Sequence, residues 1–383
     1  MIPVTKPSLD KSDFNNIKKV IKSKILTDGY FQNKTEKLIK KKINSNFVAL
    51  THSCTAALEI SAILLNLKKG DEVIMPSYGF VSVANAVVLR GAIPIFVDVE
   101  SETLNISVED VERKITSKTK AIYIIHYAGN ACKIDALIKI AKKNKIFLVE
   151  DAAHAFSAKY KNKYLGTIGD IGVFSFHETK NIVGGQAGCI SINNRSLIKR
   201  ANYILDKGTN RKQFISNMKK KIIKHSNKNF YTWVDLGSEY RIPELSCALL
   251  YSQIMKLDKI QARRKIIWSK YKKIISKLKN KHYYLVEPIK HSQSTYHICA
   301  LIFSNSIISK KFQQIMQKNK IAATFHYVPL HKSKMGKKFC KYSLPITEKI
   351  FNRVVRLPLF SDISMKNFNK ISKILQGFTK KFC

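Results

Sequence analysis

Short apolar runs alternate with helix-like stretches along the first half of the chain. The runs are apolar at every position rather than at alternate ones, as expected of strands buried on both faces of a mostly parallel sheet. They lie at residues 47–51, 72–76, 93–99, 121–127, 146–151, 171–176 and 189–193. Helical patterns at 54–67, 81–91 and 134–145 separate several of them. This β–α alternation predicts a large three-layer α/β/α domain around a mostly parallel sheet.

The pattern changes after about residue 244. A lysine-rich stretch at 245–279 predicts one long helix, and short strands and a closing helix follow it. We therefore expect a large domain at residues 1–244 and a smaller α/β domain at residues 245–383. The basic segment MKKKIIKHSNKNF at 218–230 is expected to form a solvated loop or hairpin.

Composition restricts the class of protein. The hydrophobic fraction of 45% and the mean hydropathy of −0.15 are typical of a soluble globular protein. No apolar stretch is long enough for a membrane span, and the N-terminus lacks the layout of a signal peptide, so we expect a cytoplasmic protein without membrane insertion. The seven cysteines are scattered without a CxxC pair, so neither a disulfide framework nor a metal site is predicted.

The formal net charge of +42 is the largest compositional deviation. Proteins that bind nucleic acids usually concentrate lysine and arginine on one face, in one motif or in a tail. Here lysines recur along the whole chain, beside many isoleucines and asparagines, which favours a background bias in composition. Nucleic-acid binding is therefore not expected as the main role. A basic surface still attracts an anionic substrate such as a nucleotide-diphosphate sugar.

Polar residues gather where the predicted strands end, which is where ligands bind in open α/β sheets. THSCTAAL (51–58) places small hydroxyls at a strand-to-helix turn, where backbone N–H groups favour a phosphate. The other strand ends carry PSYGF (76–80), HYAGN (126–130), VEDAAHA (149–155) and SFHETKN (175–181). A phosphate cradle, an aromatic ring, a carboxylate and a lysine are the groups that hold pyridoxal 5′-phosphate (PLP).

These stretches resemble the DegT/DnrJ/EryC1/StrS family of sugar aminotransferases, which are PLP enzymes of fold type I. The resemblance runs from IPVTKPSL to RLPLF at 356–360, and SFHETKN is its most specific part. The other stretches that carry it are GDEVIMPSYGFVSVANAVVLRGAIPIFVDV, HYAGNACKIDAL, VEDAAHAFSAKYKNKYLGTIGDIGVFSFHETKN, KGTNRKQF, YTWVDLGSEY and FHYVPLH. They look most like the branch that moves an amino group from glutamate to C4 of dTDP-4-dehydro-6-deoxyglucose, giving dTDP-4-amino-4,6-dideoxygalactose.

The resemblance implies a role for each matching position. Lys180 would form a Schiff base with the cofactor and carry the catalytic proton, and Asp151 would pair with the pyridine nitrogen. His154 would lie near the phenolic oxygen of the ring, and Phe80 would stack on the ring. The remaining implied contacts are Ser53, Cys54, Thr55 and Ser175 with the phosphate, and His326, Lys207 and Arg211 with the sugar nucleotide.

Simpler structural roles stay open for the same residues. Lys180 could be an ordinary surface lysine, Asp151 a helix cap, and His154 a hydrogen-bonded core histidine. Core packing or helix capping is also open for Phe80, Cys54, Ser53 and Thr55. The sequence departs from the family pattern at Gly79, where relatives usually carry threonine, at Gln186 in GGQAG, and at Glu239, where relatives carry Asn or Ser.

Other functions stay open beside this one. The chain could act on a different nucleotide keto-sugar, with 3-keto or gluco specificity, or be a catalytically impaired homologue with a binding or regulatory role. PLP-dependent dehydratases of the family carry histidine in place of the lysine, so Lys180 argues against that reaction. Enzymes of fold type I build each active site from two subunits, so a homodimer is expected.

Overall fold

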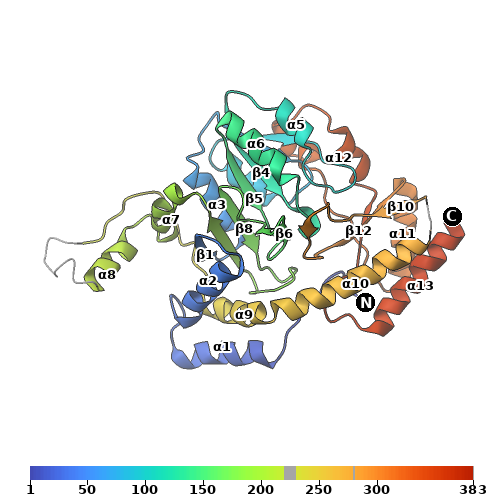
Figure 1. The fold of residues 1–383 in the computed structure, drawn as a ribbon, viewed down its shortest axis with the longest axis horizontal. Helices are drawn as coiled ribbons and strands as arrows, with labels where there is room; N and C mark the ends of the chain where they lie inside the picture. Colours follow the sequence, from blue (N-terminus) through green and yellow to red (C-terminus); the bar gives the residue numbers. More distant parts are fainter. Residues whose placement is uncertain (220–229, 279–280, 383) are drawn as a thin grey trace.

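The computed structural model describes residues 1–219, 230–278 and 281–382. At its centre lies a seven-stranded sheet with the order β1-β9-β8-β5-β4-β2-β3 (Figure 1). Paired strands run parallel except at β9, which is antiparallel to both β8 and β1. All the predicted strands are present: β1 (Phe47–Thr51), β2 (Glu72–Pro76), β3 (Ile93–Val97), β4 (Thr119–Ile125), β5 (Phe147–Asp151), β8 (Ile171–Ser175) and β9 (Gly188–Ile192).

Helices cover both faces of this sheet and produce the predicted three layers (Figure 1). One face packs against α3 (Cys54–Leu64), α4 (Ser82–Val88) and α7 (Ile198–Leu205). The opposite face packs against α2 (Tyr30–Lys42), α5 (Val108–Arg113), α6 (Ile134–Asn144) and α9 (Glu244–Met255). Helix α1 (Lys11–Ser23) packs on α9. The predicted helices at 54–67, 81–91 and 134–145 correspond to α3, α4 and α6.

The alternation of side chains along β5 separates its last two residues. Successive side chains of a strand reach opposite faces of the sheet. Val149 belongs to the core on the α3 side, and Leu148 belongs to the core on the α6 side. By the same alternation Glu150 faces the α6 side and Asp151 faces the α3 side, at the carboxyl end of the strand.

A second core lies around a three-stranded antiparallel sheet in the C-terminal part of the chain. Its strands and covering helices are β10 (Tyr283–Leu285), β12 (Cys299–Phe303), β13 (Val354–Leu357), α10 (Leu257–Lys277), α11 (Ser306–Lys318) and α13 (Met365–Phe382). Ile2 is buried in the same core and bridges to Ile321. The chain also contains α12 (Pro345–Ile350) and a small sheet of β6 (Lys159–Tyr160), β7 (Lys163–Tyr164) and β11 (Ser292–Gln293).

The prediction of one continuous helix at 245–279 is wrong. Two helices, α9 and α10, occupy this range and meet at Lys256. The residues of α9, such as Leu250, pack in the core of the large sheet, whereas Ile267 and Tyr271 of α10 pack in the second core. Leu257 and Ile260 at the start of α10 still pack in the core of the large sheet, so the chain passes to the second core within α10, between Ile260 and Ile267.

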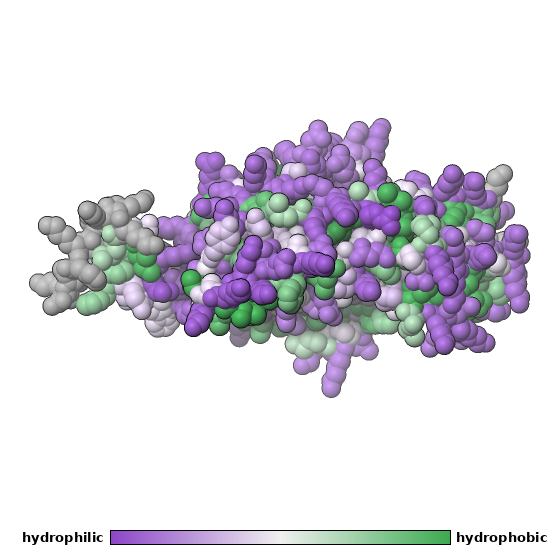
Figure 2. All heavy atoms as spheres, turned by 90° about the horizontal axis from the view of Figure 1, so that it is seen from below, coloured by the Kyte–Doolittle hydropathy of each residue, from purple (hydrophilic) through white to green (hydrophobic). Residues whose placement is uncertain are grey.

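Helix α8 (Arg211–Lys219) projects from the body of the molecule at the left of Figure 1. The predicted loop or hairpin at 218–230 falls mainly on residues 220–229, outside the described ranges. Hydrophilic side chains cover most of the face in Figure 2, with smaller hydrophobic areas between them. None of the helices in the described ranges combines the length and the apolar content that a bilayer span requires.

Candidate active site

Strands β1, β9 and β8 bring small residues together at one edge of the sheet. Gly188 pairs with Thr51 on one side and with Ser175 on the other. A Cβ atom at Gly188 would lie 2.4 Å from the backbone nitrogen of Cys54, so only glycine allows this approach. The start of β9 therefore packs directly against the Ser53–Cys54 turn, beside Ser175.

The N-terminus of α3 offers free backbone donors at this turn. Ser53 is the N-cap, and its Oγ accepts a hydrogen bond of 3.1 Å from the Ala56 N–H, so its hydroxyl does act as a helix cap. The N–H groups of Cys54 and Thr55 make no hydrogen bond to any described residue. Free N–H groups and the helix dipole favour an anion at this position.

The two carboxylates that end β5 have different surroundings. Both oxygens of Glu150 are occupied, by the N–H groups of Gly166, Ile168 and Gly169 and by His126 Nε2. Asp151 accepts one hydrogen bond of 2.9 Å at Oδ1, from the Ala153 N–H, and its Oδ2 bonds no described residue. Burial raises the pKa of Asp151, and the Ala153 N–H and the Lys180 charge oppose this rise. Asp151 is therefore the carboxylate with a free acceptor.

Lys180 lies in the loop between β8 and β9. Hydrogen bonds of 2.8 Å from Phe176 N–H to Ala187 O and from Gly184 N–H to Phe176 O close this loop. The lysine side chain is half-buried, and its Nζ forms no ion pair with a described residue. Burial lowers the pKa of Lys180 to about 8, although the charges of Cys54 and Asp151 act in the opposite direction. This pKa distinguishes Lys180 from a solvated lysine and makes it a usable nucleophile near neutral pH.

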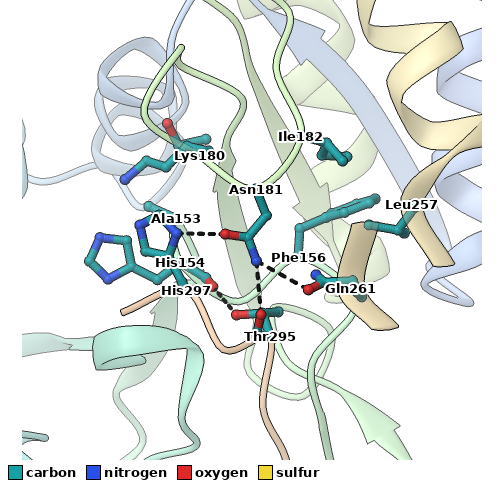
Figure 3. A pocket seen from close by; sticks show the side chains of 11 residues that line it. Ala153, His154, Phe156, Lys180, Asn181, Ile182, Leu257, Gln261, Thr295 and His297 are labelled. Carbon is teal, nitrogen blue, oxygen red and sulfur yellow. Dashed lines mark hydrogen bonds between the residues drawn. The ribbon is translucent and has the colours of Figure 1, made fainter. Parts of the chain in front are cut away.

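Asn181 ties the lysine loop to the C-terminal part of the chain (Figure 3). Its Nδ2 donates to the Thr295 carbonyl oxygen at 2.9 Å and to Gln261 Oε1 at 3.2 Å, and its Oδ1 accepts from His297 Nδ1 at 2.7 Å. The Thr295 hydroxyl in turn donates to the carbonyl oxygen of His154 at 2.6 Å. A cavity of about 10 Å³, with room for about one water, lies between these side chains and Lys180.

Three histidines, His154, His297 and His326, lie near Lys180, and the first two line the same cavity. The His154 ring centre lies 4.5 Å from that of His297 and 6.1 Å from that of His326. The Nδ1 atoms of His154 and His326 are buried and have no hydrogen-bond partner among the described residues. Burial, followed by the Lys180 charge, lowers the pKa of His154, and burial also lowers the pKa of His326. Both rings are therefore neutral near pH 7. Because its Nδ1 has no partner, His154 does not fit the alternative of a core histidine with its hydrogen bonds made within the fold.

Tyr78, Tyr127 and Arg356 complete this cluster, and none of them is among the site residues predicted from the sequence. The two tyrosine rings are 5.5 Å apart, and their buried hydroxyls face each other without a hydrogen bond of normal geometry. Arg356 Nε is buried and has no partner among the described residues. The tyrosines stand in the PSYGF and HYAGN segments, and Arg356 is a single cation within the apolar run VVRLPLF.

Phe80 and Gly79 lie at the mouth of this cluster. Phe80 is 59% exposed, so it is not packed in the core, and its ring centre lies 6.4 Å from that of Tyr327. A Cβ at Gly79 would lie 2.3 Å from Cδ1 of Ile125. The Ile125 side chain thus fills the space that a threonine at position 79 would need.

Lys207 and Arg211 lie apart from the Lys180 cluster. Both are exposed, and Arg211 begins the projecting helix α8. Lys207 forms an ion pair with Glu239, which gives this carboxylate a cationic partner within the same chain. Gln186 is exposed in the loop after Lys180, so its replacement of a glutamate disturbs no buried contact.

The residues that share the α3 side of the sheet fit PLP. The free N–H groups of Cys54 and Thr55 suit its phosphate, Asp151 Oδ2 suits a protonated pyridine nitrogen, and the Lys180 amine suits its carbonyl carbon. Asp151 and Lys180 are close enough for each charge to shift the pKa of the other. The site can therefore support amine chemistry on a bound carbonyl cofactor.

Comparisons with known proteins agree with this chemistry. The sequence pattern of the DegT/DnrJ/EryC1/StrS aminotransferase family matches residues 7–376. The uncharacterised protein MJ1066 of Methanocaldococcus jannaschii is 32% identical over 367 residues, which cover 94% of this chain and 92% of that protein. GDP-perosamine synthase of Escherichia coli O157:H7 is 30% identical over 380 residues, which cover 98% of each.

Solved structures match over the whole chain. The aminotransferase TlmJ from Streptoalloteichus hindustanus has a TM-score of 0.91 at 24% sequence identity and covers 100% of both chains. This likeness confirms the predicted fold class, a large α/β/α domain with a mostly parallel sheet and a smaller C-terminal α/β part.

Proposed function

We propose that this chain, which belongs to the DegT/DnrJ/EryC1/StrS aminotransferase family, moves an amino group from glutamate to C4 of dTDP-4-dehydro-6-deoxyglucose and so forms dTDP-4-amino-4,6-dideoxygalactose. Membership of the family makes the chain a PLP-dependent sugar aminotransferase that takes a keto-sugar and an amino donor. The predicted family and cofactor are thereby confirmed. Glutamate, the dTDP group, the C4 position and the galacto product are our proposal.

The observation that carries the proposal is the position of Lys180 with its lowered pKa beside Asp151 with its free oxygen. When bound, PLP supplies a carbonyl that condenses with amines and a ring that withdraws electrons from the reacting carbon. In our proposal Asp151 Oδ2 holds the proton of the pyridine nitrogen, and His154 lies against the phenolic oxygen. The phosphate is held by Ser53, Cys54, Thr55 and Ser175, and Phe80 covers the ring.

Lys180 is the proposed catalytic residue. Its Nζ would hold the carbonyl carbon of the cofactor until the donor binds. Nζ would then take the proton from Cα of the donor and, in the second half of the reaction, deliver a proton to C4 of the sugar. A pKa of about 8 suits both tasks, because the amine is available as a base and as an acid near neutral pH.

The sugar nucleotide is proposed to bind at His326. Lys207 and Arg211 would contribute from the arm that carries α8, which comprises residues 207–219 and 230–236 of the described chain. This arm exposes a run of large apolar side chains, among them Phe230 at 74% and Trp233 at 74%. Contiguous exposed apolar side chains mark interaction surfaces. We therefore propose a homodimer in which a second copy of the chain covers the arm. Lys207 and Arg211 of the arm would then lie at the sugar-nucleotide site of that second copy.

A GDP-linked keto-sugar is the second candidate substrate. The relative from Escherichia coli O157:H7 is named GDP-perosamine synthase, so its name gives a GDP-linked product. An aminotransferase with 3-keto or gluco specificity and a catalytically impaired homologue stay as further alternatives. The GDP-linked and the 3-keto or gluco-specific alternatives differ from our proposal in the sugar substrate and not in the class of reaction.

The test uses purified protein reconstituted with PLP. We expect a visible absorption band that is absent from Lys180→Ala and unchanged in Lys163→Ala, a matched change at an exposed lysine. With glutamate and dTDP-4-dehydro-6-deoxyglucose, NMR should show the 4-amino galacto product together with one equivalent of 2-oxoglutarate. Turnover of the GDP-linked sugar alone would favour the second candidate, and a band without turnover of any keto-sugar would favour the impaired homologue.

A further inference from the structure

Lys180 has no contact of its own that fixes the position of its amine. Its N–H donates to the His177 carbonyl oxygen at 2.9 Å, but its Nζ makes no hydrogen bond or ion pair with any described residue. The lysine stem is flexible, and the same loop contains Gly185, with φ of +79° and open space around it. The position of Nζ therefore depends on how the chain next to Lys180 is held.

Asn181, the next residue, is held by its side chain in three places (Figure 3). Its Nδ2 donates to the Thr295 carbonyl oxygen at 2.9 Å and to Gln261 Oε1 at 3.2 Å. A main-chain oxygen only accepts, so this contact fixes the orientation of the amide, and Oδ1 faces His297 Nδ1 at 2.7 Å. Burial lowers the pKa of His297 well below its usual value, so the ring is neutral and carries its proton on Nδ1. Together Gln261, Thr295 and His297 are the anchor residues of the loop.

Two of the anchor residues are also fixed by bonds that do not involve the amide. The His297 N–H donates to the Ala128 carbonyl oxygen at 3.2 Å, and the His297 carbonyl oxygen accepts from Arg264 Nη2 at 2.7 Å. The Thr295 hydroxyl donates to the His154 carbonyl oxygen at 2.6 Å. Loss of the amide would thus leave these residues in place and release the lysine loop.

The side chains just before Lys180 offer no such attachment. His177 and Thr179 are exposed, and their side chains bond each other within the same turn. The anchor residues belong instead to α10 and to the segment that leads into β12, so Asn181 joins the lysine loop to a different part of the fold. Asn181 is thus the fixed point next to Lys180.

We propose that Asn181 is a positioning residue whose side chain holds Lys180 so that Nζ lies at the carbonyl carbon of bound PLP. The inference rests on the proposed role of Lys180. In that role Nζ forms a bond to the carbonyl carbon, and the carbonyl oxygen leaves as one water. Bond formation of this kind requires the two atoms in contact and aligned, and a misplacement of about 1 Å costs about 100-fold.

The inference concerns position and not charge. The groups whose charges act on Lys180 are Cys54 on α3, Asp151 on β5 and Arg356 on β13. The Asn181 amide is uncharged, so its removal leaves these charges as they are. The titratable rings near Lys180, all with pKa values that burial lowers, are those of His154, His297 and His326.

The experiment compares two cofactor forms by calorimetry on the full-length apoprotein. Pyridoxamine 5′-phosphate carries the same ring and phosphate as PLP but an amine in place of the carbonyl, so it does not bond Lys180. The ratio of the two affinities therefore reports how well Nζ is placed. We expect wild type to bind PLP more tightly, and Lys180→Ala to lose this preference. In Asn181→Ala the affinity for PLP should fall by about 10- to 100-fold, while the affinity for pyridoxamine 5′-phosphate stays close to that of wild type.

The matched control is Asn193→Ala. Asn193 is also half-buried, and its Nδ2 donates to the Gly169 carbonyl oxygen at 2.8 Å, but it follows the far end of β9. Asn193→Ala and Asn181→Ala should both unfold at lower urea concentration than wild type, because each loses a side-chain hydrogen bond. Only Asn181→Ala should change the affinity ratio. A milder variant, Gln261→Met, removes the 3.2 Å bond alone and should lower the ratio by about two- to fivefold.

The outcomes separate positioning from a purely structural role. Equal losses of affinity for both cofactor forms in Asn181→Ala would show that the amide supports the pocket as a whole, and an unchanged ratio would show that Lys180 is placed without it. Either result would overturn the inference. If Asn181→Ala does not fold, Gln261→Met decides, since an unchanged ratio in that variant would overturn it as well. Wild-type protein without a preference for PLP would contradict the proposed role of Lys180 itself.

Discussion

The two faces of strand β5 use neighbouring carboxylates in opposite ways. On the α6 face, Glu150 is fully buried and both of its oxygens accept hydrogen bonds from the chain. On the α3 face, Asp151 keeps one free oxygen, and His154 and His326 near it keep unpaired ring nitrogens. Buried polar atoms are paired almost everywhere in folded proteins, so a group of unpaired ones marks a place where a ligand supplies the partners.

A second paired cluster sharpens this contrast. Ser77 Oγ lies 2.6 Å from His331 Nδ1, and His331 Nε2 lies 3.0 Å from Glu348 Oε1. The residue types are those of a serine hydrolase, yet Ser77 is fully buried and each of these groups already has a partner. The cluster joins the segment before Phe80 to the segment after His326, and so it fixes the fold around the site rather than reacting.

The largest expected difference between the two faces is that between Asp151→Asn and Glu150→Gln. Asp151→Asn removes the charge proposed to hold the cofactor's proton, so turnover should fall by about 10²–10³-fold with little change in the free energy of unfolding. Glu150→Gln places an amide N–H₂ against backbone donors, so the free energy of unfolding should fall by about 1–3 kcal/mol. Steady-state kinetics and urea unfolding of the apoproteins measure both.

The assignment of the two carboxylates is contradicted if each variant shows the effect expected of the other. Asp151→Asn would then unfold at lower urea concentration while keeping its turnover, and Glu150→Gln would lose turnover at unchanged stability. That result would place the functional carboxylate on the α6 face.

A smaller difference is expected between two histidines that stand five residues apart. His331→Gln disturbs both of its hydrogen bonds, so the free energy of unfolding should fall by about 1–3 kcal/mol. His326→Gln breaks no Nδ1 hydrogen bond, so stability should change by less, while the Michaelis constant for the keto-sugar should rise about tenfold. Equal losses of stability in the two variants, with unchanged kinetics for His326→Gln, would contradict this assignment.

The smallest effect concerns pH. Only a neutral amine bonds a carbonyl, and burial lowers the pKa of Lys180 to about 8. Because the lowered pKa leaves the amine neutral above that value, the rate of PLP uptake by the apoprotein should rise with pH and be half-maximal near pH 8. Stopped-flow absorbance measures this rate. A midpoint near 10.4, the value for a solvated lysine, would show that burial does not tune Lys180.

Much of the large sheet was predictable from the sequence, because strands buried on both faces read as continuous apolar runs. The strand ends also located Asp151, Lys180 and the Ser53 turn, since ligands collect at one edge of such sheets. The direction of β9 was not predictable from its apolar pattern, which is the same for either direction. The break at Lys256 was missed because apolar residues of the same core continue on both sides of it, with Ile254 before the break and Leu257 after it.

The rest of the site depends on contacts between remote segments. Arg356 joins the cluster through pairing with Ala300 and Thr324, and no local pattern reports that register. Whether a buried hydroxyl or ring nitrogen has a partner is likewise a property of packing, as the difference between His326 and His331 shows. The sequence could name the lysine that we propose to react. It could not separate the polar groups without a partner in the fold from those that are paired within it.

The central claim is that Lys180 is the amine that bonds the cofactor. The most direct test is reduction of the PLP-loaded protein with borohydride, followed by digestion and mass spectrometry. We expect the phosphopyridoxyl mass on the peptide that contains Lys180, at about one group per chain. In Asp151→Asn protein the same peptide should carry the label, reduced only by the fraction of cofactor that this variant fails to bind. A label spread over other lysines, or none in protein that carries bound PLP, would contradict the claim.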